Sequence, residues 1–144
     1  MITLDTSAVF ALVNRRDPDH GRVRDALAAD EGPYLIPAAA LAEMTFLIED
    51  RLGWKALDAF LADLEDRALR FECGEEDVAR VRQLAKRYQD LPLGAADASV
   101  IACAERLGGR VLTLDRRFDV VARDVKLHIE PSTADHAREP ARLS

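Results

Sequence analysis

Four acidic residues stand in segments that are otherwise apolar, and together they suggest metal chemistry. They are Asp5, Glu43, Asp97 and Asp115. A carboxylate in apolar surroundings is costly unless it is protonated, paired or bound to a cation. Carboxylate oxygens are the ligands that Mg²⁺ and Mn²⁺ prefer, and no histidine lies near these acids in the sequence. The four acids therefore predict one shared site for a hard divalent cation.

Each acid, taken singly, also has an ordinary structural explanation. Asp5 could form a turn after a strand, Asp97 could complement a helix dipole, and Asp115 could open a β-turn. Glu43 is harder to explain in this way, because its neighbours at helical spacing are apolar, and we expect its side chain to face inward. The combination, rather than any one acid, favours a functional site.

The elements that carry these acids alternate between strand and helix, which predicts an α/β fold with a mostly parallel sheet. Strands are expected at 2–4, 34–36, 69–73, 110–114 and 127–129, and helices at 8–14, 19–29, 38–51, 54–66, 74–88 and 95–107. Functional crevices in such sheets lie beyond the carboxyl ends of the strands, where Asp5 and Asp115 fall. If the helices that carry Glu43 and Asp97 start at the same edge, all four acids converge.

The bulk composition bounds the class of protein. A chain of 144 residues that is 49% hydrophobic and 32% charged predicts one globular domain. Its longest uncharged run, 32–42, is too short for a membrane span, and Asp5 comes too early for a secretory signal peptide. Cys73 and Cys103 fit no zinc motif, so we expect reduced thiols in a cytoplasmic protein. We expect a domain at 1–131 and a polar C-terminal tail at 132–144.

The predicted cation indicates phosphate chemistry, since carboxylate-bound Mg²⁺ chiefly activates water and stabilises leaving oxygens there. The sequence contains neither GxxxxGK[ST] nor GxGxxG, so the metal itself would have to contact the phosphate, as in nucleases. A haloacid-dehalogenase-type phosphatase needs a second Asp two residues after the first, and that position is Ser7. A receiver domain needs an acidic pair near the first strand, but Asp5 stands alone.

Four short motifs resemble those of PIN-domain proteins, and in particular the VapC-type toxins of bacterial toxin–antitoxin pairs. They are Ile2-Thr3-Leu4-Asp5-Thr6-Ser7, Ala42-Glu43, Leu91-Pro92-Leu93-Gly94-Ala95-Ala96-Asp97-Ala98 and Leu112-Thr113-Leu114-Asp115-Arg116-Arg117-Phe118. The resemblance extends from residue 1 to about 131. It implies a PIN-like three-layer sandwich, in which helices flank a central, mostly parallel sheet on both faces.

The resemblance also implies a function, a Mg²⁺- or Mn²⁺-dependent endoribonuclease that acts as a toxin. The catalytic and metal-binding residues would be Asp5, Glu43, Asp97 and Asp115. Thr6 or Ser7, either of which we also expect to cap the helix from 8 to 14, would be the supporting hydroxyl. Structured RNA would be cut in a single-stranded loop, where unstacked bases can enter a crevice.

The net charge of −6 argues against broad electrostatic binding of nucleic acid. A bound cation would neutralise part of the acidic cluster, and local basic residues could hold the RNA phosphates that flank the cut. The candidates are Arg15, Arg16, Arg116 and Arg117. Each of them is equally well explained as an ordinary solvated surface residue.

The resemblance implies two protein partners, a cognate antitoxin and a second copy of the chain, and no membrane. Trp54, Leu57, Leu61 and Leu64 form an apolar stripe on the helix from 54 to 66. Core packing and a partner-binding surface both explain this stripe. An inert PIN fold that binds RNA or protein is the alternative function, although the intact set of four acids argues against it.

Overall fold

The chain forms one five-stranded sheet within the residues that this computed structural model describes, 1–72 and 74–131. Its strands are β1 (Ile2–Leu4), β2 (Tyr34–Pro37), β3 (Arg70–Glu72), β4 (Arg110–Leu112) and β5 (His128–Glu130). They lie in the order β3-β2-β1-β4-β5, and every neighbouring pair is parallel. The predicted α/β fold with a parallel sheet is confirmed.

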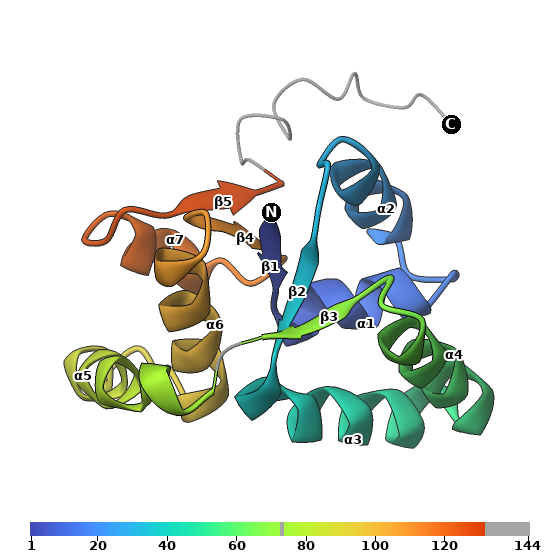
Figure 1. Ribbon diagram of the computed structural model, residues 1–144, viewed down its shortest axis with the longest axis horizontal. Coiled ribbons are helices and arrows are strands. Elements are labelled where there is room, and N and C mark those ends of the chain that lie inside the picture. The colour runs from blue at the N-terminus through green and yellow to red at the C-terminus, as the bar shows by residue number, and fades with distance from the viewer. Residues whose placement is uncertain (73, 132–144) are drawn as a thin grey trace.

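Helices cover both faces of this sheet (Figure 1). They are α1 (Thr6–Val13), α2 (His20–Ala28), α3 (Leu41–Leu52), α4 (Trp54–Glu65), α5 (Val78–Arg87), α6 (Ala95–Arg106) and α7 (Arg117–Ala122). Crossovers between parallel strands are right-handed, so the path from β1 to β3 leaves α1–α4 on one face. The return path through β4 to β5 leaves α5–α7 on the other. The predicted three-layer sandwich is therefore confirmed, and the winding reverses between β1 and β4.

The core lies on both sides of the central strands. Helix α6 contacts β1, β2 and β4, and every residue from 98 to 104 in it is buried. Val9 of α1, Ile48 of α3 and Phe60 of α4 are fully or almost fully buried in the same core cluster. An α-helix that is apolar almost all round belongs in such a position, as the sequence of α6 predicts.

The ends of several elements differ from the predicted ones. A 3₁₀ turn at Ala38–Ala40 precedes α3, and a second at Glu75–Asp77 precedes α5, so both α-helices start later than expected. Strand β4 ends at Leu112. The residue that caps α1 is Asp5, whose carboxylate accepts the Ala8 N–H at 2.9 Å. The predicted capping role of Thr6 or Ser7 is therefore wrong, because the preceding carboxylate already reaches the free N–H.

Three further expectations meet different outcomes. Cys103 is disulfide-bonded, so the expectation of a reduced thiol at this position is wrong. Cys73 and the predicted tail at 132–144 lie outside the described residues. In the part of the chain that is described, no helix is both long enough and apolar enough to cross a membrane.

Candidate active site

The candidate site lies at the edge of the sheet where the winding reverses. Strands β1 and β4 run in parallel with Leu4 opposite Leu112, so both strands end at the same edge. Asp5 follows β1 directly, and Asp115 follows β4 after two more residues. The carboxyl ends of two strands at a reversal point form the usual crevice of an open parallel sheet.

Asp5 is the most enclosed acid of the site, with only 2% of its surface exposed. Its Oδ1 accepts the Ser7 hydroxyl at 2.7 Å and the Ala8 N–H at 2.9 Å, and its Oδ2 accepts the Thr113 hydroxyl at 2.5 Å. Burial raises the pKa of Asp5 to about 6 even though these three hydrogen bonds lower it, and the charge of Asp97 raises it further. Asp5 is thus a fixed carboxylate for which the described residues provide no ion pair.

Two hydroxyls tie Asp5 to the segment after β4. The Ser7 hydroxyl accepts the Leu114 N–H at 2.9 Å, and the Thr113 hydroxyl accepts the Asp115 N–H at 3.0 Å. Both hydroxyls also donate to the Asp5 carboxylate. Ser7 therefore holds the first acid and the backbone beside the fourth acid in one network, which supports its predicted auxiliary role.

All four predicted acids line one cleft of about 440 Å³, which we call the carboxylate cleft. Thr6, Ser7 and Arg117 line it as well. Asp97 enters from the first turn of α6, and Glu43 from the first turn of α3. The predicted convergence of the four acids on one cleft is what the structure shows.

The orientation of Glu43 differs from the predicted one. Its side chain is exposed within the cleft wall, whereas Met44 and Ile48 are 1% exposed and occupy the core-facing side of α3. A 3₁₀ turn directly precedes this helix. The prediction that Glu43 faces inward is therefore wrong, although its neighbours are apolar as the sequence indicates.

Asp97 and Asp115 share a positive partner, Arg117. Its Nη2 lies 2.5 Å from Asp115 Oδ2 and 3.2 Å from Asp97 Oδ2, and its Nε lies 2.9 Å from Asp115 Oδ2. Burial would raise the pKa of Asp115, but the bonds from Arg117 lower it overall. For Asp97, burial outweighs Arg117 and raises the pKa, with help from the charges of Glu43 and Asp115.

The residues of the carboxylate cleft fit a hard divalent cation in kind. Apart from Arg117 and Arg51, the charged side chains that line the cleft are carboxylates. The pKa values of Asp5 and Asp97 are raised, because the hydrogen bonds and positive charge around these acids do not offset the cost of burial. Carboxylates of this kind are ligands that hard divalent cations prefer. Among the described residues, no three His, Cys, Asp or Glu side chains already converge closely enough to hold an ion. Two of the four candidate ligands, Asp97 and Asp115, are already in contact with Arg117.

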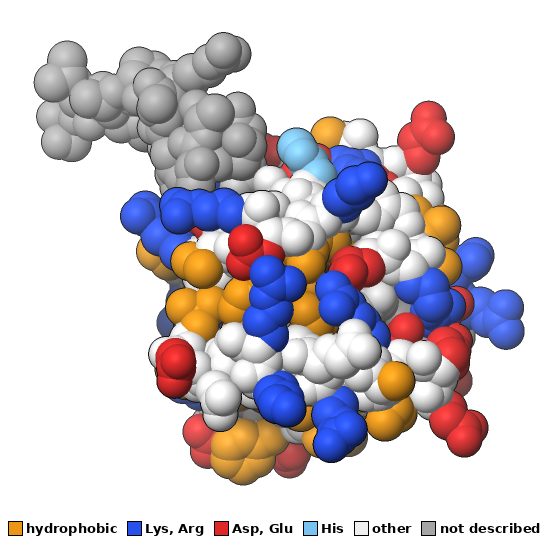
Figure 2. Space-filling model, turned by 90° about the vertical axis from the view of Figure 1, so that its left-hand side faces the viewer, with side chains coloured by type: hydrophobic (Ala, Val, Ile, Leu, Met, Phe, Trp, Pro, Cys, Tyr) orange, Lys and Arg blue, Asp and Glu red, His pale blue; other side chains and the backbone are white. Residues whose placement is uncertain are grey.

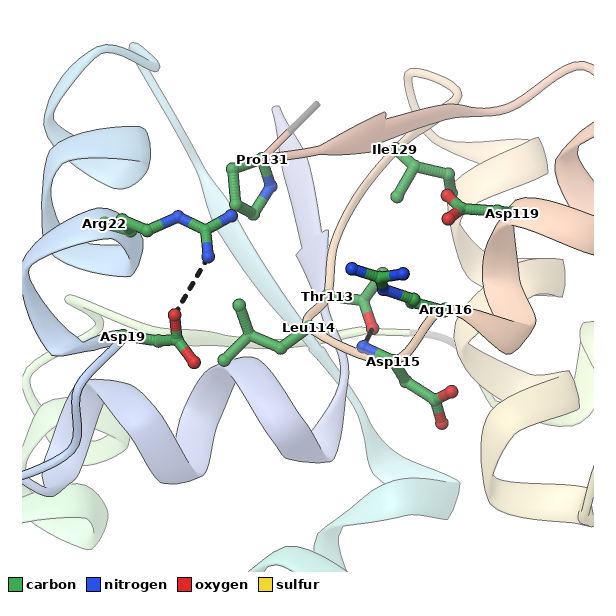
Figure 3. A pocket seen from close by; sticks show the side chains of 9 residues that line it. All are labelled: Asp19, Arg22, Thr113, Leu114, Asp115, Arg116, Asp119, Ile129 and Pro131. Carbon is green, nitrogen blue, oxygen red and sulfur yellow. Dashed lines mark hydrogen bonds and ion pairs between the residues drawn. The ribbon is translucent and has the colours of Figure 1, made fainter. Parts of the chain in front are cut away.

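The predicted phosphate-binding arginines are spread over different places. Arg15 and Arg16 are exposed after α1 and do not line the carboxylate cleft. Arg116 lines a second pocket of about 230 Å³. There its side chain points from the segment before α7 toward Arg22 of α2, which pairs with Asp19 at 2.9 Å (Figure 3). Of the four arginines, Arg117 alone lies in the carboxylate cleft.

Two charged residues of the cleft were not predicted, Arg51 and Asp17. Arg51 lies on α3 and stacks over the Phe10 ring, with 5.7 Å between the guanidinium carbon and the ring centroid. The series Glu43, Leu47 and Arg51 has the spacing of one helix face, so the sequence contained a signal for Arg51. Asp17 follows α1 in an irregular segment, for which helical spacing gives no signal.

The sequence matches a known family over most of its length. The PIN-domain family model matches residues 2–124. Ribonuclease VapC26 of Mycobacterium tuberculosis is 32% identical over 124 residues, which cover 85% of this chain and 92% of that protein. The chain belongs to the PIN-domain family, and the predicted family is confirmed.

Solved structures show the same fold at lower sequence identity. VapC20 of M. tuberculosis, described as a Sarcin-Ricin loop cleaving toxin, superposes with a TM-score of 0.75 at 23% identity, covering 84% of this chain and 95% of that one. VapBC2 from Rickettsia felis, bound to a DNA fragment from its promoter, gives a TM-score of 0.65 at 17% identity, covering 90% and 98%. These two structures agree with the five-stranded parallel sheet described above.

Proposed function

We propose that this PIN-domain protein is a Mg²⁺- or Mn²⁺-dependent endoribonuclease and the toxin of a toxin–antitoxin pair. The observation that carries the proposal is the carboxylate cleft, where buried Asp5 meets Asp97, Glu43 and Asp115 at the switch point of the sheet. The likeness to a ribonuclease across 85% of the chain supports the same reaction class.

In the proposed mechanism, Asp5, Glu43 and Asp97 would hold the divalent ion, and Asp115 would support them. When bound, the ion supplies positive charge at the scissile phosphate and makes water a better nucleophile. Ser7 and Thr113 keep the Asp5 carboxylate in one orientation through bonds of 2.7 and 2.5 Å. The water oxygen bonds to phosphorus as the bond to O3′ breaks, and one proton of the water ends on O3′, which leaves a 5′-phosphate and a 3′-hydroxyl.

The proposed substrate is structured RNA that is cut in a single-stranded loop. The cleft lies beyond the strand ends and has a volume of about 440 Å³, and unstacked bases of a loop can enter such a crevice more readily than a stiff duplex. The description of VapC20 as a loop-cleaving toxin supports this choice. Arg51 joins the predicted arginines as a candidate contact for flanking phosphates. The other candidates are Arg15, Arg16, Arg116 and Arg117. Such RNA lies in the cytoplasm, where we propose that the protein acts.

The basic residues on one face of the molecule are distributed rather than gathered in one stripe. On the face formed by α5, α7 and β5, Lys and Arg side chains are spread among acidic and apolar ones (Figure 2). This arrangement supports local phosphate contacts near the cut rather than broad electrostatic binding, in keeping with the net charge of −6.

The proposed partners are an antitoxin and a second copy of the chain. On α4, Leu57 and Leu64 are buried, whereas Trp54 is 63% exposed and Leu61 is 37% exposed. The predicted stripe is therefore divided between core and surface. Phe46 of α3 is also 67% exposed, so α3 and α4 present apolar side chains that a partner could cover. The VapBC2 complex among the similar structures supports an antitoxin partner.

Cleavage of a synthetic hairpin RNA with an unpaired loop, beside a fully paired duplex of the same sequence, tests this function. With Mn²⁺ we expect cuts in the loop only, and none in EDTA. Asp97→Asn should lower the rate by about 100-fold or more, because it weakens metal binding at the reacting phosphate. Equal cutting by the variant, or by the wild type in EDTA, would contradict the proposed site.

A further inference from the structure

Arg117 is held at the carboxylate cleft by three different segments of the chain. Its Nε and Nη2 bond the Asp115 carboxylate, its Nη2 reaches Asp97 Oδ2 at 3.2 Å, and its Nη1 donates to the Pro92 carbonyl at 2.8 Å. The planar guanidinium is thus engaged on all three nitrogens. A side chain that served only as solvated surface would have no such set of partners.

The positive charge of Arg117 neutralises part of the acidic charge that a bound cation would otherwise neutralise. Two carboxylates that face one cleft repel each other, and a guanidinium between them removes much of that repulsion. Arg116, one residue earlier, shows the contrast. It is exposed, and within the described residues its guanidinium has no hydrogen bond or ion pair. Only Arg117 of this pair acts as a counter-ion.

The same contacts place Arg117 in competition with a divalent ion. A cation that coordinates Asp97 would sit about 2.1 Å from the carboxylate oxygen, close to a guanidinium that already bonds that oxygen. Two positive charges so near each other, in a partly buried cleft, are mutually unfavourable. The ion and the guanidinium therefore compete for Oδ2 of Asp97.

We propose that Arg117 is a built-in competitor of the catalytic metal, which binds Asp97 and Asp115 in the metal-free protein and must swing away when the ion enters. This inference rests on the proposed function, since it takes the carboxylates as metal ligands. Arg117 would thus regulate the binding of the metal. The contact with Arg117 sets the metal concentration at which the site fills, and it keeps the empty site from being destabilised by its own acids.

Calorimetric titration of Mn²⁺ into wild type, Arg117→Met and Arg116→Met tests the competition. Both variants lose one positive charge from adjacent positions, but only Arg117→Met frees Asp97 and Asp115. Apparent affinity falls with the fraction of molecules in a competent state. We expect Arg117→Met to bind Mn²⁺ about tenfold more tightly than wild type, and Arg116→Met to change affinity by about twofold or less.

The outcomes separate this inference from the proposed function. Wild type that binds no Mn²⁺ at millimolar concentration would contradict the metal site itself. Wild type that binds Mn²⁺, with Arg117→Met binding equally or more weakly, would overturn the competition and leave the metal site intact. An equal gain in both variants would also overturn it, because general charge would then explain the effect.

A measurement on wild type covers the case in which Arg117→Met does not fold. In the metal-free protein, the Arg117 Nε–H should give a protected NMR signal, because it donates to Asp115 at 2.9 Å. Addition of diamagnetic Mg²⁺ should shift this signal and speed its exchange with water. A signal that stays unchanged at saturating Mg²⁺ would contradict the displacement of Arg117.

Discussion

At the scale of single residues, the two Thr-Leu-Asp sequences of this chain end in acids with opposite surroundings. Asp5 is 2% exposed and bonded by hydroxyls and an N–H, and burial raises its pKa to about 6. The Asp115 side chain is 23% exposed, and Arg117 overcomes the effect of burial and lowers its pKa. Identical local sequences therefore produce one uncompensated acid and one paired acid, and the uncompensated one is the better candidate for a primary metal ligand.

The raised pKa of Asp5 predicts that its charge destabilises the metal-free fold. Folded Asp5 keeps its proton up to about pH 6, whereas unfolded Asp loses it near pH 4. The folded state then binds more protons between these values, so stability falls as the pH rises through this window. Asp5→Asn, which keeps the shape of the side chain, should be about 1 to 2 kcal/mol more stable than wild type near pH 7.5 and no more stable near pH 4.

Urea unfolding in EDTA at both pH values checks this prediction. Asp58→Asn is the matched control, since Asp58 is exposed on α4 and does not line the carboxylate cleft. We expect no pH-dependent gain for the control. If Asp5→Asn were less stable than wild type at neutral pH, the hydrogen bonds of the Asp5 carboxylate would outweigh the cost of its charge, which would contradict the prediction.

At the scale of elements, Ser7 joins the first turn of α1 to the segment that follows β4. Its hydroxyl donates to Asp5 and accepts the Leu114 N–H at 2.9 Å, across 107 positions of the chain. The switch point of the sheet is thus fixed by side-chain bonds as well as by strand pairing. A cleft whose ligands come from separate elements needs such fixed supports to keep its geometry.

Removal of this hydroxyl should loosen the junction. Ser7→Ala leaves the partly buried Leu114 N–H without its partner, which should cost about 1 to 2 kcal/mol of unfolding free energy. Thr45→Ala is the control, because the Thr45 hydroxyl bonds only carbonyls of its own helix and should cost about 0.5 kcal/mol or less. Thermal unfolding of both variants would decide, and an equal loss in both would argue against a special role for Ser7.

The sequence predicts the elements better than the orientation of single side chains. Short apolar runs that end in Asp predict that Asp5 and Asp115 lie at the carboxyl ends of parallel strands. The sheet topology then brings these two ends together at the point where the winding reverses. The face that Glu43 occupies does not follow from its apolar neighbours, because Met44 and Ile48 already take the core-facing side of α3. The bonds of Arg117 depend on three segments meeting in space, so no local pattern could have predicted them.

At the scale of the whole molecule, charges are paired at one end of the sheet and clustered at the other. Near the amino ends of β1 and β4, the buried Asp30 bonds the N-terminal ammonium at 3.1 Å and also pairs with Arg110, which reaches Glu130. At the carboxyl ends, Arg117 pairs with Asp97 and Asp115, whereas no ion pair of Asp5 or Glu43 is found among the described residues. The paired charges at the amino ends stabilise the fold. At the carboxyl ends, the incomplete pairing of the acids allows the cleft to attract a cation.

If the carboxylate cleft cuts RNA with a divalent metal, cleavage of total RNA by the purified protein depends on both the metal and the acids of the cleft. Wild type, Glu43→Gln and Glu49→Gln are compared with Mn²⁺ and with EDTA. Glu49 is exposed on the same helix as Glu43 but does not line the cleft. We predict discrete fragments from wild type and Glu49→Gln in Mn²⁺ only, and about 100-fold slower cleavage by Glu43→Gln. Fragments of equal yield from Glu43→Gln, or from wild type in EDTA, would contradict the claim.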